Sequence, residues 1–126
     1  MLLIGPPGAG KSDLVLRLLA RGFHLVADDR TEVVDGVARP VPALAGLLEV
    51  RGLGIFRLPY EASARLALVV QLGQAAPRMP TPARHEGFDL PLATVDAQAA
   101  SAPERVGLAL DCALGRIAQL AGAFTA

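Results

Sequence analysis

The sequence predicts an α/β fold, and three features near its start support that prediction. An apolar run at residues 2–4 is typical of a short buried strand. The segment GPPGAGKS at residues 5–12 follows, with the Gly-x-x-x-x-Gly-Lys-Ser pattern of a phosphate-binding loop. Residues 13–21 then carry apolar side chains at helical spacing and stop at Gly22. A strand, a glycine-rich loop and a helix in this order place the N-terminus of the helix against an anion.

Each position of the loop suits the binding of a nucleotide. Its glycines can adopt backbone angles that a side chain forbids, so their N–H groups can converge on a phosphate. Lys11 supplies a mobile positive charge for the terminal phosphates, and the Ser12 hydroxyl suits the coordination of Mg²⁺. The predicted nucleotide-binding residues are those of the whole loop: Gly5, Pro6, Pro7, Gly8, Ala9, Gly10, Lys11 and Ser12.

The composition predicts one globular domain over residues 1–126. The chain is 52% hydrophobic and has a formal net charge of zero, which leaves room for a core and gives no basic face for nucleic acid. Its apolar stretches are far shorter than the roughly 20 residues that cross a bilayer, so we expect no membrane association. The single Cys112 fits a reducing compartment, and we expect a cytoplasmic location.

Short strands and turns are predicted up to residue 56. Residues 24–29 suggest a strand that ends in two carboxylates. An Asp-Gly pair between β-branched residues predicts a tight hairpin over residues 31–38. Residues 42–47 follow as a short helical turn, and residues 47–56 as a strand broken by two glycines.

The second half of the chain predicts two strands and a long helix. Residues 65–72 and 88–95 have the pattern of strands, and residues 75–86, which are rich in proline, that of a mobile loop. Ser101 and Glu104 form a capping-box pattern at the start of a helix, whose apolar side chains repeat as far as Leu120.

Asp28 and Asp29 are the first candidates for chemistry beyond nucleotide binding. At the end of a strand next to the loop strand, two carboxylates can face one magnesium ion. Successive strand residues point to opposite sides, so one can bind metal while the other does different work. The alternative is that the pair only starts a turn or caps a helix.

Glu49 and Arg51 form a second candidate pair. Spaced by two in a strand they share one face, where an exposed ion pair contributes little to stability. The neighbouring Gly52 and Gly54 instead suggest a bulge or a close approach of the backbone to a ligand. Both interpretations stay open.

His24 and His85 have no partner at the spacing of metal ligands, so we expect no zinc site. Arg84 is most simply a surface residue, although a mobile loop would let it supply charge to a phosphate.

In this order, GPPGAGKSDL, LVADDRTEV and LLEVRGLGIF resemble the catalytic domain of bacterial HPr kinase/phosphorylase. The resemblance runs from Leu2 to about Ile117. LLEVRGLGI is its most specific part, because P-loop proteins in general do not share it. The later stretch SAPERVGLALD resembles the short, single-domain members.

The resemblance implies a P-loop α/β core related to phosphoenolpyruvate carboxykinase, with a mixed sheet, flanking helices and usually a hexameric assembly. It implies an enzyme that uses Mg²⁺ and transfers phosphate from ATP, or in some members pyrophosphate, to a serine of the phosphocarrier protein HPr. Many members also run the reverse reaction with inorganic phosphate. Residues 75–86 hold few basic side chains, which favours kinase over phosphorylase activity.

The resemblance also implies roles for individual residues. One of the two aspartates would be the general base of phosphorylation and the acid of its reversal, and Arg51 would belong to the signature strand linked to phosphorolysis. The implied catalytic residues are Asp28, Asp29, Lys11 and Arg51, and the implied magnesium ligands are Ser12, Asp28 and Glu49.

Members of this family carry a strand pair before the loop, with a histidine close to the aspartates. Here the loop already begins at residue 5. Either the start lies further upstream, which the very short first strand favours, or this form lacks the strand pair and has an unpaired sheet edge. Two other functions stay open: a P-loop kinase of a small metabolite, and an ATP-sensing module without turnover.

Overall fold

The chain forms two compact units. The structure, a computed structural model, describes residues 1–73 and 75–126. The first unit comprises residues 1–11 and 66–126, and the second comprises residues 12–65. The single domain expected from the composition stays a prediction.

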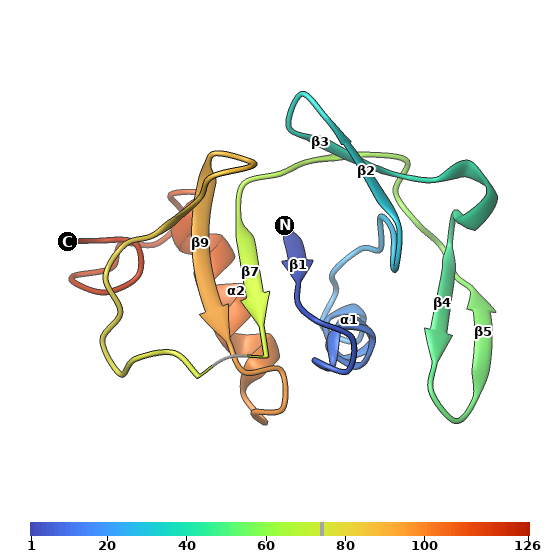
Figure 1. Ribbon diagram of the computed structural model, residues 1–126, viewed down its shortest axis with the longest axis horizontal. Coiled ribbons are helices and arrows are strands. Elements are labelled where there is room, and N and C mark those ends of the chain that lie inside the picture. The colour runs from blue at the N-terminus through green and yellow to red at the C-terminus, as the bar shows by residue number, and fades with distance from the viewer. Residues whose placement is uncertain (74) are drawn as a thin grey trace. The chain divides into compact units, whose positions relative to one another are not determined.

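A four-stranded mixed sheet forms the first unit, in the order β1-β7-β9-β8. β1 (Leu2–Ile4), β7 (Val69–Leu72) and β9 (Leu90–Val95) are parallel and lie side by side (Figure 1). β8 (Arg84–His85) pairs antiparallel with β9 at the edge. The mixed sheet predicted from the sequence is confirmed, and the α/β class with it.

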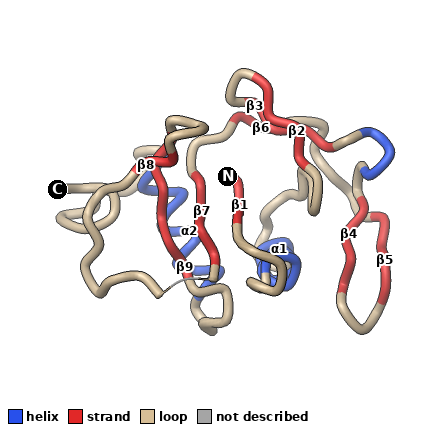
Figure 2. The backbone as a smooth tube through the Cα atoms, viewed as in Figure 1, coloured by secondary structure: helices blue, strands red, loops and turns tan. Residues whose placement is uncertain are grey.

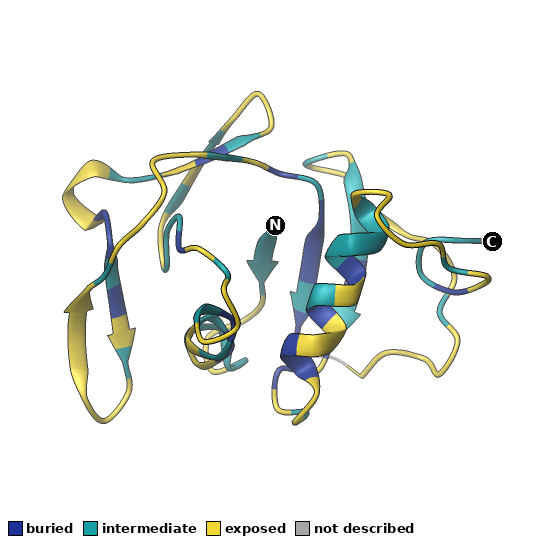
Figure 3. Ribbon diagram, turned by 180° about the vertical axis from the view of Figure 1, so that it is seen from behind, coloured by how far each residue is buried: buried dark blue, intermediate teal, exposed yellow. Residues whose placement is uncertain are grey.

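Helix α2 (Ala102–Ala113) covers one face of β7 and β9 (Figures 1 and 3). Its buried residues Ala102, Val106 and Ala109 pack into the unit, whereas the Leu108 side of the helix faces solvent. Helical spacing of these small and apolar residues produces this two-sided pattern. The other buried residues of this core are Leu66, Leu68, Val69, Val70, Leu72, Ala93, Val95, Ala97 and Pro103.

The helix is shorter than the apolar repeat predicts. Gly115 has φ of 73°, and its N–H donates to the carbonyl of Cys112 at 3.1 Å. The N–H of Arg116 donates to the carbonyl of Asp111 at 2.8 Å. This is the Schellman motif that ends a helix at a glycine. Leu120, predicted to continue the apolar face, lies beyond the helix and is 95% exposed.

The capping box predicted at the start of α2 is not formed. The Ser101 side chain makes no cap hydrogen bond. Its hydroxyl instead accepts a bond from Nε of Arg105 at 2.8 Å. Pro103 in the first turn needs no N–H partner there, so the helix still begins where the sequence predicts.

Part of the predicted strand 65–72 is not in the sheet. β7 begins only at Val69, although Leu66 and Leu68 are buried. The carbonyl of Leu68 accepts the N–H of Leu2 at 2.9 Å just before β7 begins, so the apolar run marks buried residues that extend beyond the strand. The predicted loop 75–86 has no helix or strand at residues 75–83, but residues 84–85 form β8, so the loop is shorter than predicted. Its mobility stays a prediction.

The second unit holds all of α1 (Lys11–Leu19) except Lys11, and the helix residues Leu14 and Leu18 are buried. β2 (Thr31–Val34) and β3 (Val37–Pro40) then form the predicted hairpin. Asp35 and Gly36 both have positive φ, at 52° and 76°, as a type I′ turn requires.

β6 (Ala64–Arg65) completes this sheet beside β3, and Figure 2 shows the three strands together. The short helix η1 (Pro42–Leu44) confirms the helical turn predicted after β3.

Two predictions for the second unit are wrong. Residues 24–29 form no strand: the carbonyl of Leu25 accepts one backbone bond from Glu61 at 2.7 Å, and β1 pairs with β7 instead. The single broken strand at residues 47–56 is a hairpin of β4 (Leu47–Val50) and β5 (Gly54–Arg57). The two glycines, with φ of 85° at Gly52 and 124° at Gly54, reverse the chain rather than interrupt a strand.

Candidate functional site

The phosphate loop lies at the carboxyl ends of the parallel strands of the first unit. A Cβ placed on Gly5 would lie 3.2 Å from the end of β7 at Leu72. A Cβ placed on Gly10 would lie 3.3 Å from Ala97, just after β9. This edge, where consecutive parallel strands end, is where open α/β sheets bind ligands.

The backbone of the loop has the conformation that its glycines allow. Gly8 and Gly10 have φ of 84° and 90°, which side chains disfavour. The N–H of Ala9 donates to the carbonyl of Pro6 at 3.1 Å, which tightens the turn. α1 begins directly afterwards at Lys11, so the structure has the predicted order of strand, loop and helix.

In the second unit, Ser12 and Asp28 meet although sixteen residues separate them. The Ser12 hydroxyl donates to Oδ1 of Asp28 at 3.1 Å, in a half-buried position. Adjacent ligands of an octahedral Mg²⁺ at about 2.1 Å lie about 3.0 Å apart. These two oxygens thus already have the spacing of neighbouring magnesium ligands, and a hydroxyl and a carboxylate are donors that fit this ion.

Asp28, Asp29 and Glu49 line one depression of about 130 Å³ in this unit. The structure thereby brings together three acidic residues that the sequence selected separately. Among the described residues, no three acidic, histidine or cysteine side chains lie close enough to hold a metal ion. Ligation by Glu49 therefore stays a prediction.

The rest of the lining was missed from the sequence. Arg30 follows Asp29 directly, so the run Asp-Asp-Arg was the available signal. Three apolar side chains complete the wall: Leu44 from η1, Leu47 from β4 and Ile55 from β5. Three carboxylates against one guanidinium give the depression an excess of negative charge, which favours a bound cation.

Arg51 differs from its prediction. It lies in the exposed turn between β4 and β5, whereas Glu49 is in β4 opposite Ile55. The two residues do not share a strand face, because the strand ends at Val50. Arg51 is not part of the lining of the depression within the described chain.

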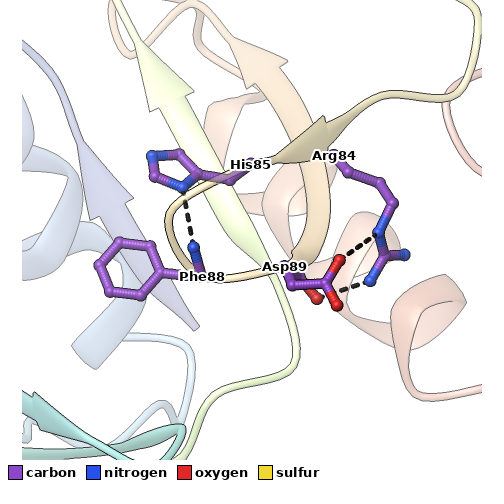
Figure 4. Close-up of polar contacts among 4 residues, drawn as sticks. All are labelled: Arg84, His85, Phe88 and Asp89. Atoms are coloured by element: carbon purple, nitrogen blue, oxygen red, sulfur yellow. Dashed lines mark hydrogen bonds and ion pairs between the residues drawn. The ribbon is translucent and has the colours of Figure 1, made fainter.

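Arg84 and His85 belong to a structural turn (Figure 4). Nε of Arg84 lies 3.1 Å from Oδ1 of Asp89, so the guanidinium has a carboxylate partner. Nδ1 of His85 accepts the N–H of Phe88 at 3.3 Å, and the two rings lie 4.9 Å apart between centroids. These contacts give Arg84 and His85 a role in joining β8 to β9.

Within the described chain, no helix is both long and apolar enough to cross a membrane.

Comparison with known proteins agrees with the resemblance found in the sequence. The family model described as HPr Serine kinase C-terminal domain matches residues 1–78, more than half of the chain. The HPr kinase/phosphorylase of Clostridium novyi is 46% identical over 63 residues, which cover 47% of this chain and 20% of that protein. The HPr kinase/phosphorylase of Xylella fastidiosa is 38% identical over 100 residues, which cover 68% of this chain and 31% of that protein.

A solved structure of a similar protein has the same fold. The Hpr(Ser) kinase/phosphatase from Coxiella burnetii superimposes with a TM-score of 0.71 at 18% identity, over 90% of this chain and 82% of that one. The chain spans only a fifth to a third of the length of the curated relatives named above. Because the family model matches more than half of its length, the chain belongs to the HPr serine kinase C-terminal domain family.

Proposed function

We propose that this chain carries out the phosphotransfer of an HPr kinase/phosphorylase, moving the terminal phosphoryl group of ATP to a serine of HPr. Membership in the family supports the reaction class. The contact between Ser12 and Asp28 carries the proposal, because it joins the hydroxyl of the phosphate-loop motif to the acidic pair. ATP and Mg²⁺ are the proposed cofactors.

The donor phosphates would be held by residues 5–11. The N–H groups of the loop and the start of α1 favour negative charge, and Lys11 adds a full positive charge. Bound Mg²⁺ would neutralise charge on the transferring group, and Ser12 and Asp28 are its proposed ligands, with Glu49 as a third.

This assignment leaves Asp29 as the proposed general base. Asp28 is half-buried and engaged by Ser12, whereas Asp29 is exposed on the same depression. Asp29 would take the proton of the substrate serine as its oxygen forms a bond to phosphorus and the bond to the ADP oxygen breaks. In the reverse direction the same carboxyl group would return the proton.

The partners follow from the same proposal. HPr is the protein substrate, the assembly is a hexamer and the location is cytoplasmic. Arg51 is assigned to reversal by phosphorolysis, and its exposed position on a turn leaves it accessible to a partner. The forward kinase reaction is the proposed main activity.

The test is transfer of label from ATP to HPr of the same cell, read as phosphoserine. Wild type should transfer phosphate, and Lys11→Ala should reduce the transfer severely. Asp89→Asn, which changes a surface carboxylate paired with Arg84, is the matched control and should not. Consumption of ATP stimulated by a metabolite but not by HPr would establish a small-molecule kinase. Binding of ATP without any turnover would establish a sensing module.

A further inference from the structure

The segment after β9 lies directly against the phosphate loop. A Cβ placed on Gly10 would lie 3.0 Å from Nε2 of Gln98 and 3.3 Å from the Ala97 side chain. All of these residues belong to the first unit. The Gln98 amide therefore sits beside a residue whose backbone helps to form the predicted anion site.

The backbone at Gln98 is held from both sides. Its N–H donates to Oδ1 of Asp96 at 2.9 Å, and the N–H of Ala99 donates to the carbonyl of Asp96 at 3.1 Å. Ala97 is 1% exposed and anchors the segment in the core. The N–H of Ala102 then donates to the carbonyl of Ala99 at 3.0 Å, where α2 begins. The main chain is fixed by these contacts while the Gln98 side chain is exposed.

The Gln98 side chain has a donor to offer at this position. Within residues 1–73 and 75–126, its amide makes no hydrogen bond to another group of the chain. A glutamine amide carries two N–H donors, and the oxygens of a phosphate chain are mainly hydrogen-bond acceptors at neutral pH. Hydrogen bonds to a charged acceptor are stronger than those between neutral groups.

We propose that Gln98 is a further ligand of the phosphate chain of the donor, donating from Nε2 to a phosphate oxygen held by the loop. Asp96 is a positioning residue that acts through the backbone of Gln98. The inference rests on one part of the proposed function, namely that a donor with linked phosphates binds at residues 5–11.

The experiment measures equilibrium binding of inorganic pyrophosphate and of ADP to the full chain, so that neither HPr nor turnover is needed. Gln98→Ala should weaken the binding of both by about the same factor, about tenfold. Gln98→Glu keeps the size of the side chain but places a carboxylate beside the phosphates, and should weaken both further. Gln119→Ala, which removes a glutamine bonded to the N–H of Phe124, is the matched control and should leave both unchanged.

The outcomes separate this inference from the proposed function. Unchanged binding in both Gln98 variants would overturn it, and so would weaker binding of ADP alone, because Gln98 would then serve the nucleoside. Failure of wild type to bind either compound would overturn it together with the nucleotide site. Absence of transfer to HPr, with the expected losses of pyrophosphate binding, would refute only the proposed function. Circular dichroism of each variant would exclude loss of fold as the cause.

Discussion

Asp28→Asn is the most informative change in the proposed magnesium site. It removes one negative charge without altering the volume of the side chain. The remaining amide oxygen can still accept the Ser12 hydrogen bond, which is 3.1 Å long and half-buried. We therefore expect the fold to persist and the metal site to fail.

The size of the effect follows from the position of the charge. Oδ1 of Asp28, which lies 3.1 Å from the Ser12 hydroxyl, would contact the Mg²⁺ that stabilises the transferring phosphoryl group. Removal of one such stabilising group lowers rates by about 10²–10³-fold. For Asp28→Asn most of this loss should show as a higher Mg²⁺ requirement, because the variant binds the cation more weakly.

The assay is the initial rate of transfer to HPr at increasing Mg²⁺ concentration. Asp28→Asn should raise the Mg²⁺ concentration at half-maximal rate. Asp29→Asn should lower the maximal rate by about 10²–10⁴-fold, as expected for a general base, with the Mg²⁺ requirement unchanged. If Asp29→Asn raised the Mg²⁺ requirement and Asp28→Asn lowered only the maximal rate, Asp29 would be the metal ligand and Asp28 the general base. An unchanged Mg²⁺ requirement in both variants would refute the metal site inferred from the Ser12 contact.

Three further predictions concern metal dependence and stability. Removal of Mg²⁺ with EDTA should abolish transfer to HPr and its return should restore activity; activity that persists in EDTA would contradict a metal-assisted reaction. In urea unfolding, Leu48→Ala should lower the free energy of unfolding by about 2–5 kcal/mol, because Leu48 is fully buried. Leu53→Ala should change it by less than about 0.5 kcal/mol, because Leu53 lies on the same hairpin but is 76% exposed. Equal losses would contradict the burial pattern. Gly46→Ala should cost more than about 1 kcal/mol, because φ there is 77° and the new Cβ would lie 2.7 Å from the Leu58 carbonyl oxygen; an unchanged melting temperature would refute this close approach.

Features decided by neighbouring residues were predictable from the sequence. The Asp35-Gly36 turn follows from two adjacent residues that tolerate positive φ. The order of strand, glycine loop and helix around residues 5–12 also follows from local chemistry. The end of α2 also depends on a local feature, the positive φ of Gly115. This glycine is easily overlooked in the sequence because the apolar repeat continues past it.

Strand pairing could not be predicted in the same way. Residues 24–29, with apolar side chains at 25–27, read as a strand, yet they form none and β1 pairs with β7. The run at residues 47–56 reads as one strand because alternation alone does not show where a chain reverses. Backbone hydrogen bonds decide both cases, between distant segments for β1 and β7 and between adjacent ones for β4 and β5. A pattern of side chains does not specify these bonds.

The sequence by itself determined the phosphate-binding loop, the acidic pair and the family, because each depends on residue types at short and fixed spacing. Only the tertiary structure decided which residues far apart in the sequence lie close together. It placed Ser12 against Asp28, Glu49 on the same depression as the two aspartates, and Gln98 beside Gly10. These residues are 16 positions apart for Ser12 and Asp28, 20 and 21 for Glu49 and the two aspartates, and 88 for Gly10 and Gln98. Such contacts arise from the packing of whole elements, so no local pattern encodes them.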